Sequence, residues 1–123
     1  MVTEKRAWAE IDLDAIENNI KEIRRHVGDK PKIMGVVKAD GYGHGYLEVA
    51  KTHLENAADS VGVAFLHEAL QLRQCGIDTP ILILGNTPSK YAEELIENDI
   101  MPNCYTKELA VAMSNAGAKL NKA

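Results

Sequence analysis

The stretch Gly35–Gly45, with the sequence GVVKADGYGHG, brings one lysine from an apolar run to a turn rich in glycine. Residues 33–37 form the short, nearly continuous apolar run that is typical of a strand buried on both faces of a parallel sheet. The three glycines after Lys38 permit a positive φ or the close approach of another group. We therefore predict that Lys38 lies at the carboxyl end of a buried strand, where barrel enzymes place their chemistry.

Lys38 has two possible interpretations when only its neighbours are considered. A lysine after a strand is most often a solvated charge, because lysine is seldom buried without a partner. In a partly dry pocket, however, a lysine can lose its proton and condense with an aldehyde to form a Schiff base. The apolar strand before Lys38 and Tyr42 after it suit a planar cofactor, but these residues alone leave both interpretations open.

Residues 36–45 closely resemble the pyridoxal-phosphate attachment segment of the alanine racemase family. Further similarity follows in the same order at residues 8–16, 63–69 and 80–85, so the resemblance covers essentially the whole chain. It implies a cytoplasmic, homodimeric enzyme that interconverts L-alanine and D-alanine and supplies D-alanine for cell-wall peptidoglycan. The resemblance also implies that pyridoxal 5'-phosphate is the cofactor and alanine the small-molecule substrate.

The same resemblance assigns roles to three residues. Lys38 would hold the cofactor covalently through an imine and would also act as the base on one face of the substrate. Tyr42 matches the tyrosine that contacts the cofactor phosphate, and Leu84 matches an apolar residue beside the cofactor ring. The arginine at the pyridine nitrogen and the second base, a tyrosine, have no matching segment here. We therefore expect these 123 residues to be inactive by themselves.

The pattern along the chain predicts repeated strand–helix units of an α/β protein. Helices are expected at 13–27, 45–56, 67–75, 88–98 and 107–117, and strands at 33–37, 61–66, 81–84 and 100–105. Four such units are the first half of a (β/α)8 TIM-type barrel, which we assign to residues 12–123 and regard as truncated. The alternating residues 7–11 predict a short strand, so residues 1–11 are expected to be an N-terminal strand that packs with a separate β domain in the family.

Several residues at predicted boundaries carry more local expectations. Asp12, Thr87 and Thr106 are predicted N-caps, and Gly117 is predicted to end the last helix. We expect His44 to form local hydrogen bonds that hold the glycine loop, and Cys104 to lie in the fourth strand.

Composition and charge exclude several classes of function. The net charge is −4, and no basic cluster with interleaved aromatic residues is present, so we expect no nucleic-acid partner. No apolar stretch approaches the roughly 18 residues of a membrane span. Cys75 and Cys104 lack metal-ligand spacing, and His67-Glu68 lacks the second histidine of a zinc motif, so we expect no metal.

Two alternatives remain open at this stage. The chain could belong to a racemase of the same fold that acts on serine or another amino acid. It could also be a half-barrel interaction module without catalytic activity. The sequence does not decide whether the chain is naturally short or part of a longer protein.

Overall fold

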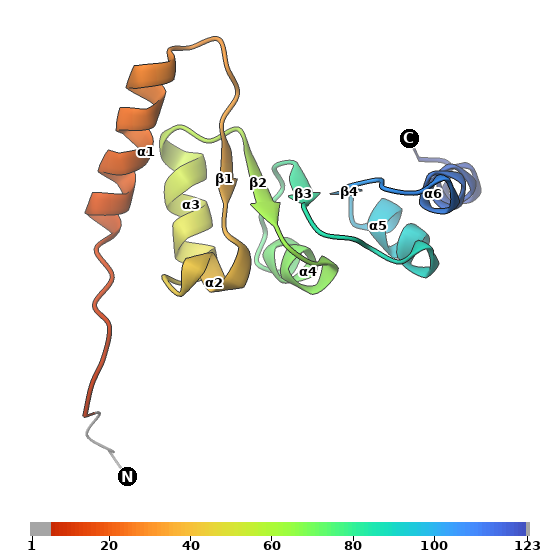
Figure 1. Ribbon diagram of the computed structural model, residues 1–123, viewed down its shortest axis with the longest axis horizontal. Coiled ribbons are helices and arrows are strands. Elements are labelled where there is room, and N and C mark those ends of the chain that lie inside the picture. The colour runs from red at the N-terminus through yellow and green to blue at the C-terminus, as the bar shows by residue number, and fades with distance from the viewer. Residues whose placement is uncertain (1–5, 123) are drawn as a thin grey trace.

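The computed structural model describes residues 6–122, in which short strands alternate with helices (Figure 1). The strands within that range form one parallel sheet in the order β1-β2-β3-β4. They are β1 (Met34–Val36), β2 (Ser60–Val63), β3 (Ile81–Ile83) and β4 (Ile100–Pro102). The predicted α/β architecture is thereby confirmed, with strands in sequence order as in one half of a barrel.

Helical segments precede, connect and follow the strands. They are α1 (Leu13–Val27), α2 (Lys38–Tyr42), α3 (Tyr46–Asn56), α4 (Leu66–Gln74), the 3-10 turn η1 (Ser89–Tyr91), α5 (Ala92–Glu97) and α6 (Lys107–Leu120). Caps at the ends of α1 and α6 agree with the sequence: Asp12 accepts a hydrogen bond from Ala15 N at 3.1 Å, and Thr106 accepts one from Leu109 N at 3.2 Å.

The two faces of the sheet have different surroundings. Val61, Val63, Ile81 and Ile83 point to the face covered by helices and are completely buried, or nearly so. The opposite, inner face carries a row of paired residues across the four strands, Val36–Gly62–Leu82–Met101, and the Met101 side chain is 43% exposed. We expected strands that are buried on both faces. The strands are buried on the face covered by helices, but the inner face is partly exposed.

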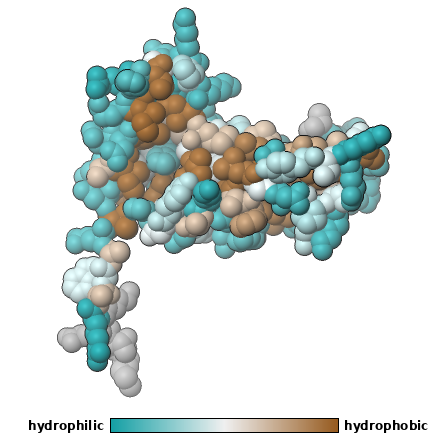
Figure 2. Space-filling model, in the orientation of Figure 1, coloured by the Kyte–Doolittle hydropathy of each residue, from teal (hydrophilic) through white to brown (hydrophobic). Residues whose placement is uncertain are grey.

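Helix α1 packs along α3, which in turn contacts β1 (Figure 1). Its apolar stripe follows the predicted spacing, but only Ile20 is buried, while Ile23 and Val27 are exposed. Figure 2 shows hydrophobic side chains gathered on α1 and along the neighbouring part of the sheet. An open groove of about 520 Å³ runs between α1 and β1, lined in part by Ile23 and Met34.

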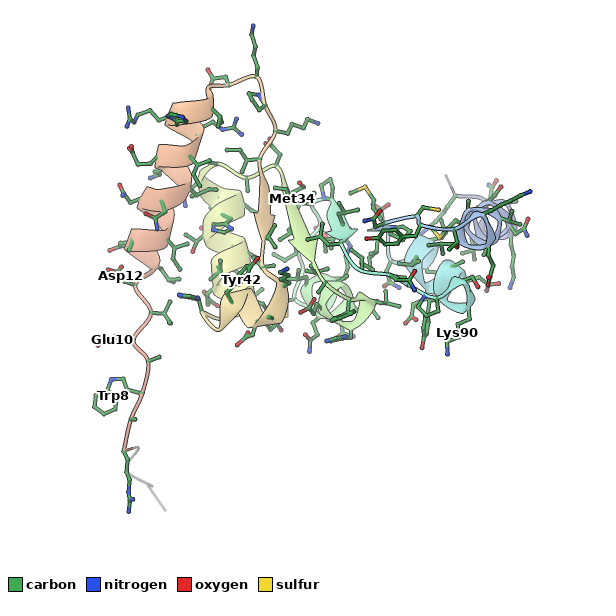
Figure 3. All side chains as sticks on the ribbon, viewed as in Figure 1. Trp8, Glu10, Asp12, Met34, Tyr42 and Lys90 are labelled. Carbon is green, nitrogen blue, oxygen red and sulfur yellow. The ribbon has the colours of Figure 1, made fainter. Side chains whose placement is uncertain are left out.

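The strand predicted for residues 7–11 is not present. These residues are irregular, exposed and unpaired with any other described residue, and they extend away from the sheet (Figure 3). The Trp8 side chain is 75% exposed. An alternating pattern forms a strand only where a neighbouring strand satisfies its backbone groups, and none lies beside this segment. Residues 1–5 of the predicted strand lie outside the described residues.

Other boundaries also differ from the sequence predictions. The strands are shorter than expected, because α4 already begins at Leu66 and the chain leaves β4 after Pro102, before Cys104. Helix α6 continues through Gly117 to Leu120 and ends at Asn121, which adopts the left-handed conformation. Gly117 is required there for space, since an added Cβ would lie 2.8 Å from the Lys122 carbonyl oxygen.

The predicted cap at Thr87 is also wrong. Its hydroxyl is buried and has no hydrogen-bond partner within the described residues, and Pro88 instead precedes η1. The single helix expected over 88–98 is therefore divided into a 3-10 turn and a short α-helix.

Candidate active site at the carboxyl ends of the strands

Lys38 lies at the carboxyl end of β1, as predicted. The preceding Val37 is buried and its N–H donates to the Gly62 carbonyl at 2.9 Å, so the pairing with β2 continues up to the lysine. The Lys38 side chain is half-buried, and its Nζ lies 5.8 Å from the centroid of the Tyr42 ring. This distance allows a cation–π contact and brings the two predicted site residues together.

The segment after Lys38 is a left-handed helical turn. Ala39, Asp40, Gly41 and Tyr42 all have φ between 50° and 61°. Gly41 N donates to the Val37 carbonyl at 2.9 Å, and Gly43 N donates to that of Ala39 at 3.0 Å. A left-handed helical conformation costs an L-residue roughly 1–2 kcal/mol, so three non-glycine residues adopt it only if the surroundings hold them.

Side chains on both sides of this turn supply hydrogen bonds to it. Asp40 Oδ1 accepts from Tyr46 N at 3.0 Å and so ties the turn to the start of α3. His44 Nδ1 lies 3.1 Å from the carbonyl oxygens of both Gly41 and Tyr42, which confirms the local role expected for this histidine. A further bond arrives from α4, because the Glu68 carboxylate accepts from Ala39 N at 2.8 Å.

Tyr42 and Leu84 lie on the same rim of the sheet as Lys38. Tyr42 is 59% exposed and lines the groove between α1 and β1. Leu84 follows β3 directly: its N–H donates to the Val63 carbonyl at 2.8 Å, and its own carbonyl accepts from the Tyr105 hydroxyl at 2.9 Å. The structure thus pairs Tyr42 with Lys38 and places Leu84 on the third strand of the rim.

The residues at this rim fit a flat aldehyde cofactor such as pyridoxal 5'-phosphate. Lys38 provides an amine, Tyr42 an exposed aromatic ring with a hydroxyl group, and Leu84 an apolar side chain. Ala64, which follows β2 between the strands that carry Lys38 and Leu84, adds only a methyl group. The middle of the rim therefore presents little bulk against a planar ring.

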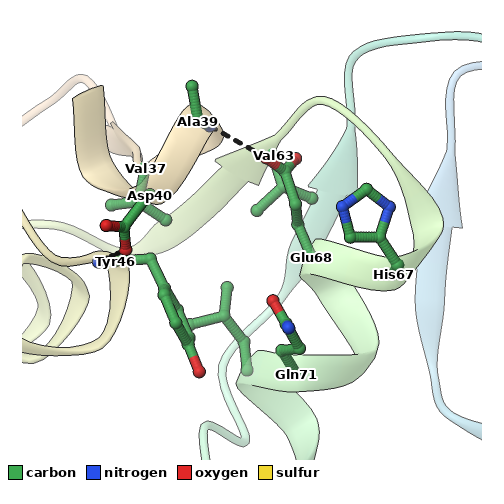
Figure 4. A pocket seen from close by; sticks show the side chains of 9 residues that line it. Val37, Ala39, Asp40, Tyr46, Val63, His67, Glu68 and Gln71 are labelled. Atoms are coloured by element: carbon green, nitrogen blue, oxygen red, sulfur yellow. Dashed lines mark hydrogen bonds between the residues drawn. The ribbon is translucent and has the colours of Figure 1, made fainter. Parts of the chain in front are cut away.

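A cavity of about 440 Å³ lies on the helical side of the turn, between α3 and α4 (Figure 4). Asp40 and Glu68 contribute carboxylates to its wall, but both already accept hydrogen bonds from backbone amides. Tyr46 also lines it, and the Cys75 thiol 3.9 Å from the Tyr46 hydroxyl raises the pKa of that tyrosine. The two carboxylates of this cavity thus hold the turn to the starts of α3 and α4.

A histidine on α3 lies behind β1, away from the rim. Burial lowers the pKa of His53, and its Nδ1 has no hydrogen-bond partner within residues 6–122. The ring occupies the space beside Gly35, where an added Cβ would approach Nδ1 to 2.6 Å. Gly35 therefore allows α3 to pack closely on the strand that ends at Lys38.

Glu68 is the residue at this rim whose importance was not predicted from the sequence. Its position in the first turn of α4, three residues after Phe65, is a signal for a helix cap. That signal does not reveal the contact with Ala39, which lies 29 residues earlier.

Among residues 6–122, no group of three or more His, Cys, Asp or Glu side chains could hold a metal ion. Over that range, no helix combines the length and the apolar character that crossing a bilayer requires.

Comparison with known proteins identifies the family. Residues 11–123 match the family described as alanine racemase, N-terminal domain. The alanine racemase of Clostridium perfringens is 53% identical over 115 residues, which make up 94% of this chain and 30% of that protein.

Solved structures give the same result. The crystal structure of alanine racemase from Bacillus anthracis with bound L-Ala-P is 40% identical, with a TM-score of 0.86 over 94% of this chain and 30% of that chain. The histidine racemase from Leuconostoc mesenteroides subsp. sake is 33% identical, with a TM-score of 0.78 over 88% of this chain and 29% of the other.

These matches confirm the expected half of a (β/α)8 barrel. The chain spans about 30% of the length of the curated relatives it matches. It is a member of the alanine racemase family and corresponds to part of the N-terminal domain of that family.

Proposed function

We propose that this chain is the N-terminal part of a racemase that interconverts L-alanine and D-alanine, with pyridoxal 5'-phosphate attached to Lys38. The observation that supports this most directly is the position of the lysine, half-buried at the carboxyl end of β1 with Nζ 5.8 Å from the Tyr42 ring. Tyr42 would contact the cofactor phosphate, and Leu84 would lie against the cofactor ring.

The chemical problem is the removal of the Cα proton of an amino acid, which is a very weak acid. When bound, pyridoxal phosphate supplies the delocalisation that stabilises the negative charge left on Cα. The Lys38 amine is the proposed proton acceptor and donor on one face of the substrate. Inversion also needs a base on the opposite face, which we expect from another part of a homodimeric full-length protein. A cytoplasmic location, where D-alanine would supply peptidoglycan synthesis, belongs to the same proposal.

The test uses the full-length gene product and its Lys38→Ala variant. Each protein is mixed with pyridoxal phosphate and treated with borohydride, and the modified peptide is located by mass spectrometry. We expect a reduced adduct on Lys38 in the wild type and none in the variant, together with a loss of racemisation of at least about a thousandfold. An adduct on another lysine, or full activity in the variant, would contradict the assignment.

The substrate is the second point to test, because a histidine racemase is among the structural relatives. Racemisation rates of the full-length protein should be compared for alanine, serine and histidine. We expect kcat/KM to be highest for alanine. A preference for another amino acid would leave the cofactor assignment intact and replace the substrate.

The chain of 123 residues is predicted to be inactive by itself. Purified residues 1–123 should show no racemisation above background in the presence of pyridoxal phosphate. If the full-length protein also fails to form an adduct, a half-barrel interaction module becomes the better description.

A further inference from the structure

Glu68 on α4 joins two segments that are distant in the sequence. One carboxylate oxygen accepts from Ala39 N at 2.8 Å (Figure 4). The other accepts from Ala64 N at 2.6 Å and from Phe65 N at 3.0 Å. Three backbone amides from the ends of β1 and β2 therefore share one side chain.

The backbone explains why an external acceptor is needed at Ala39. The first N–H groups of any helical turn have no partner within the turn, and a polar side chain at the N-cap usually accepts from one of them. The N-cap residue of the left-handed turn is Val37, whose side chain cannot accept a hydrogen bond. Phe65, the N-cap residue of α4, also has a side chain that cannot accept a hydrogen bond. Glu68 thus caps both turns.

We propose that Glu68 is a positioning residue for Lys38: its carboxylate holds the adjoining Ala39 amide and thereby fixes the left-handed turn that begins directly after the lysine. The role of Lys38 in this proposal rests on the function proposed above. Ala39 directly follows Lys38 and has φ 50°, a conformation that an alanine adopts only when it is held. Release of the Ala39 amide would therefore widen the range of orientations of the lysine.

Two substitutions separate this role from simple capping of α4. Glu68→Asp keeps the charge and should still reach the Phe65 amide at the N-cap of its own helix, but the shorter side chain should lose Ala39. Glu68→Gln keeps the length but replaces one of the two acceptor oxygens by an NH2 donor, which would face the amide N–H of one of the two segments. Glu94→Gln is the matched control, because Glu94 is the third residue of α5, as Glu68 is of α4, one strand–helix unit later.

The first measurement is amide hydrogen exchange of the cofactor-free, full-length protein. Loss of a charged hydrogen bond should accelerate exchange at Ala39 by about tenfold in Glu68→Asp and Glu68→Gln. Exchange at Ala39 should remain at the wild-type rate in Glu94→Gln. This measurement is independent of the proposed cofactor.

The second measurement is the rate at which pyridoxal phosphate becomes trapped on Lys38, recorded against pH. Both Glu68 variants should attach the cofactor about tenfold more slowly or with a shifted pH profile, while Glu68→Asp unfolds at nearly the temperature of the control. A purely structural role would change the unfolding temperature and leave the pH profile unchanged.

The outcomes distinguish the two proposals. Wild-type exchange at Ala39 and wild-type attachment in Glu68→Asp would overturn the positioning role. If Glu68→Gln fails to fold, Glu68→Asp decides the question alone. If the wild type forms no adduct on Lys38, the proposed function fails, and a positioning role for that attachment fails with it, even where exchange confirms the contact between Glu68 and Ala39.

Discussion

The two rims of the sheet are held together mainly by side chains of opposite charge, with the Asp59 carboxylate as an exception at the amino rim, where it accepts from the Ile33 N–H. At the amino ends of the strands, Arg24 donates to the carbonyls of Gly28, Pro31 and Ala57, and Arg73 donates to those of Ile77, Thr79, Asn98 and Asp99. At the carboxyl ends, Asp40 and Glu68 instead accept from backbone amides.

The direction of the chain explains this difference. Each helix in a strand–helix unit ends near the amino end of the next strand, and its last carbonyl groups lack partners there. Each helix begins near the carboxyl end of the preceding strand and leaves free N–H groups there. Guanidinium groups therefore suit one rim and carboxylates the other. We expect changes at the amino rim to affect stability, and changes at the carboxyl rim to affect Lys38.

The largest effect on stability is expected for Arg73→Ala. Its guanidinium reaches four carbonyl groups, with distances that include 2.9 Å to Asn98 O, 2.8 Å to Thr79 O and 2.6 Å to Asp99 O. Loss of these bonds should lower the free energy of unfolding by about 3 kcal/mol. Urea unfolding of the full-length protein would measure the change.

Arg73→Lys is the control, and it should recover only part of the loss, because an ammonium group lacks the planar array of donors. Full recovery would show that charge alone, and not the geometry of the guanidinium, holds this rim.

Arg24→Ala should have the next largest effect, a loss of about 2 kcal/mol in the free energy of unfolding. Its guanidinium connects the segment after α1 with the end of α3 through bonds of 2.6 Å to Pro31 O and 3.0 Å to Ala57 O. Arg25, the next residue of the same helix, is 76% exposed and pairs only with Glu22 among the described residues. The Arg25→Ala variant should therefore unfold at nearly the same urea concentration as the wild type. If both variants lost the same free energy of unfolding, the special role of Arg24 at the amino rim would be contradicted.

Asp40→Ala tests the opposite rim, with an expected loss of about 1 kcal/mol, because the N–H of Tyr46 loses its acceptor. The rate of cofactor attachment to Lys38 should fall more than the stability does. Asp40→Asn should restore both, since asparagine retains an acceptor and tolerates a positive φ. If Asp40→Ala lowered the free energy of unfolding but left the rate of cofactor attachment to Lys38 unchanged, the carboxyl rim would affect stability only, as the amino rim does.

The smallest effect is a change in acid sensitivity at the amino rim. The Ile33 N–H, and then the Arg24 guanidinium, hold the pKa of Asp59 below its ordinary value. The folded state thus favours the carboxylate, and this stabilisation is present above about pH 4 and is lost as the pH falls through the lower folded value. In the Asp59→Asn variant, the free energy of unfolding should depend less steeply on pH below about pH 4. An unchanged slope would exclude this contribution.

The sequence was sufficient for features that depend on neighbouring residues. The caps at Asp12 and Thr106 and the apolar runs that become β1 and β3 follow from local spacing, and Lys38 lies where the end of its run predicts. The position of Tyr42 beside Lys38 also follows, because only three residues lie between them.

Features that depend on distant residues could not be predicted in this way. The bond from Glu68 to Ala39 and those from Arg73 to the end of α5 require the sheet to be assembled first. The left-handed turn was only partly foreseen, because alanine, aspartate and tyrosine adopt a positive φ there as well as glycine. The strand predicted at residues 7–11 failed for a related reason, since its pattern does not specify a neighbour.

The exposed Trp8 has a practical consequence for spectroscopy. It is the only tryptophan in the 123 residues, and it lies on the extended N-terminal segment, away from the sheet. Its fluorescence emission will therefore resemble that of indole in water whether the strands and helices are folded or not. Unfolding of this chain should be followed by circular dichroism. A blue shift of the emission in a longer protein would instead report that the N-terminal segment has docked against an apolar surface.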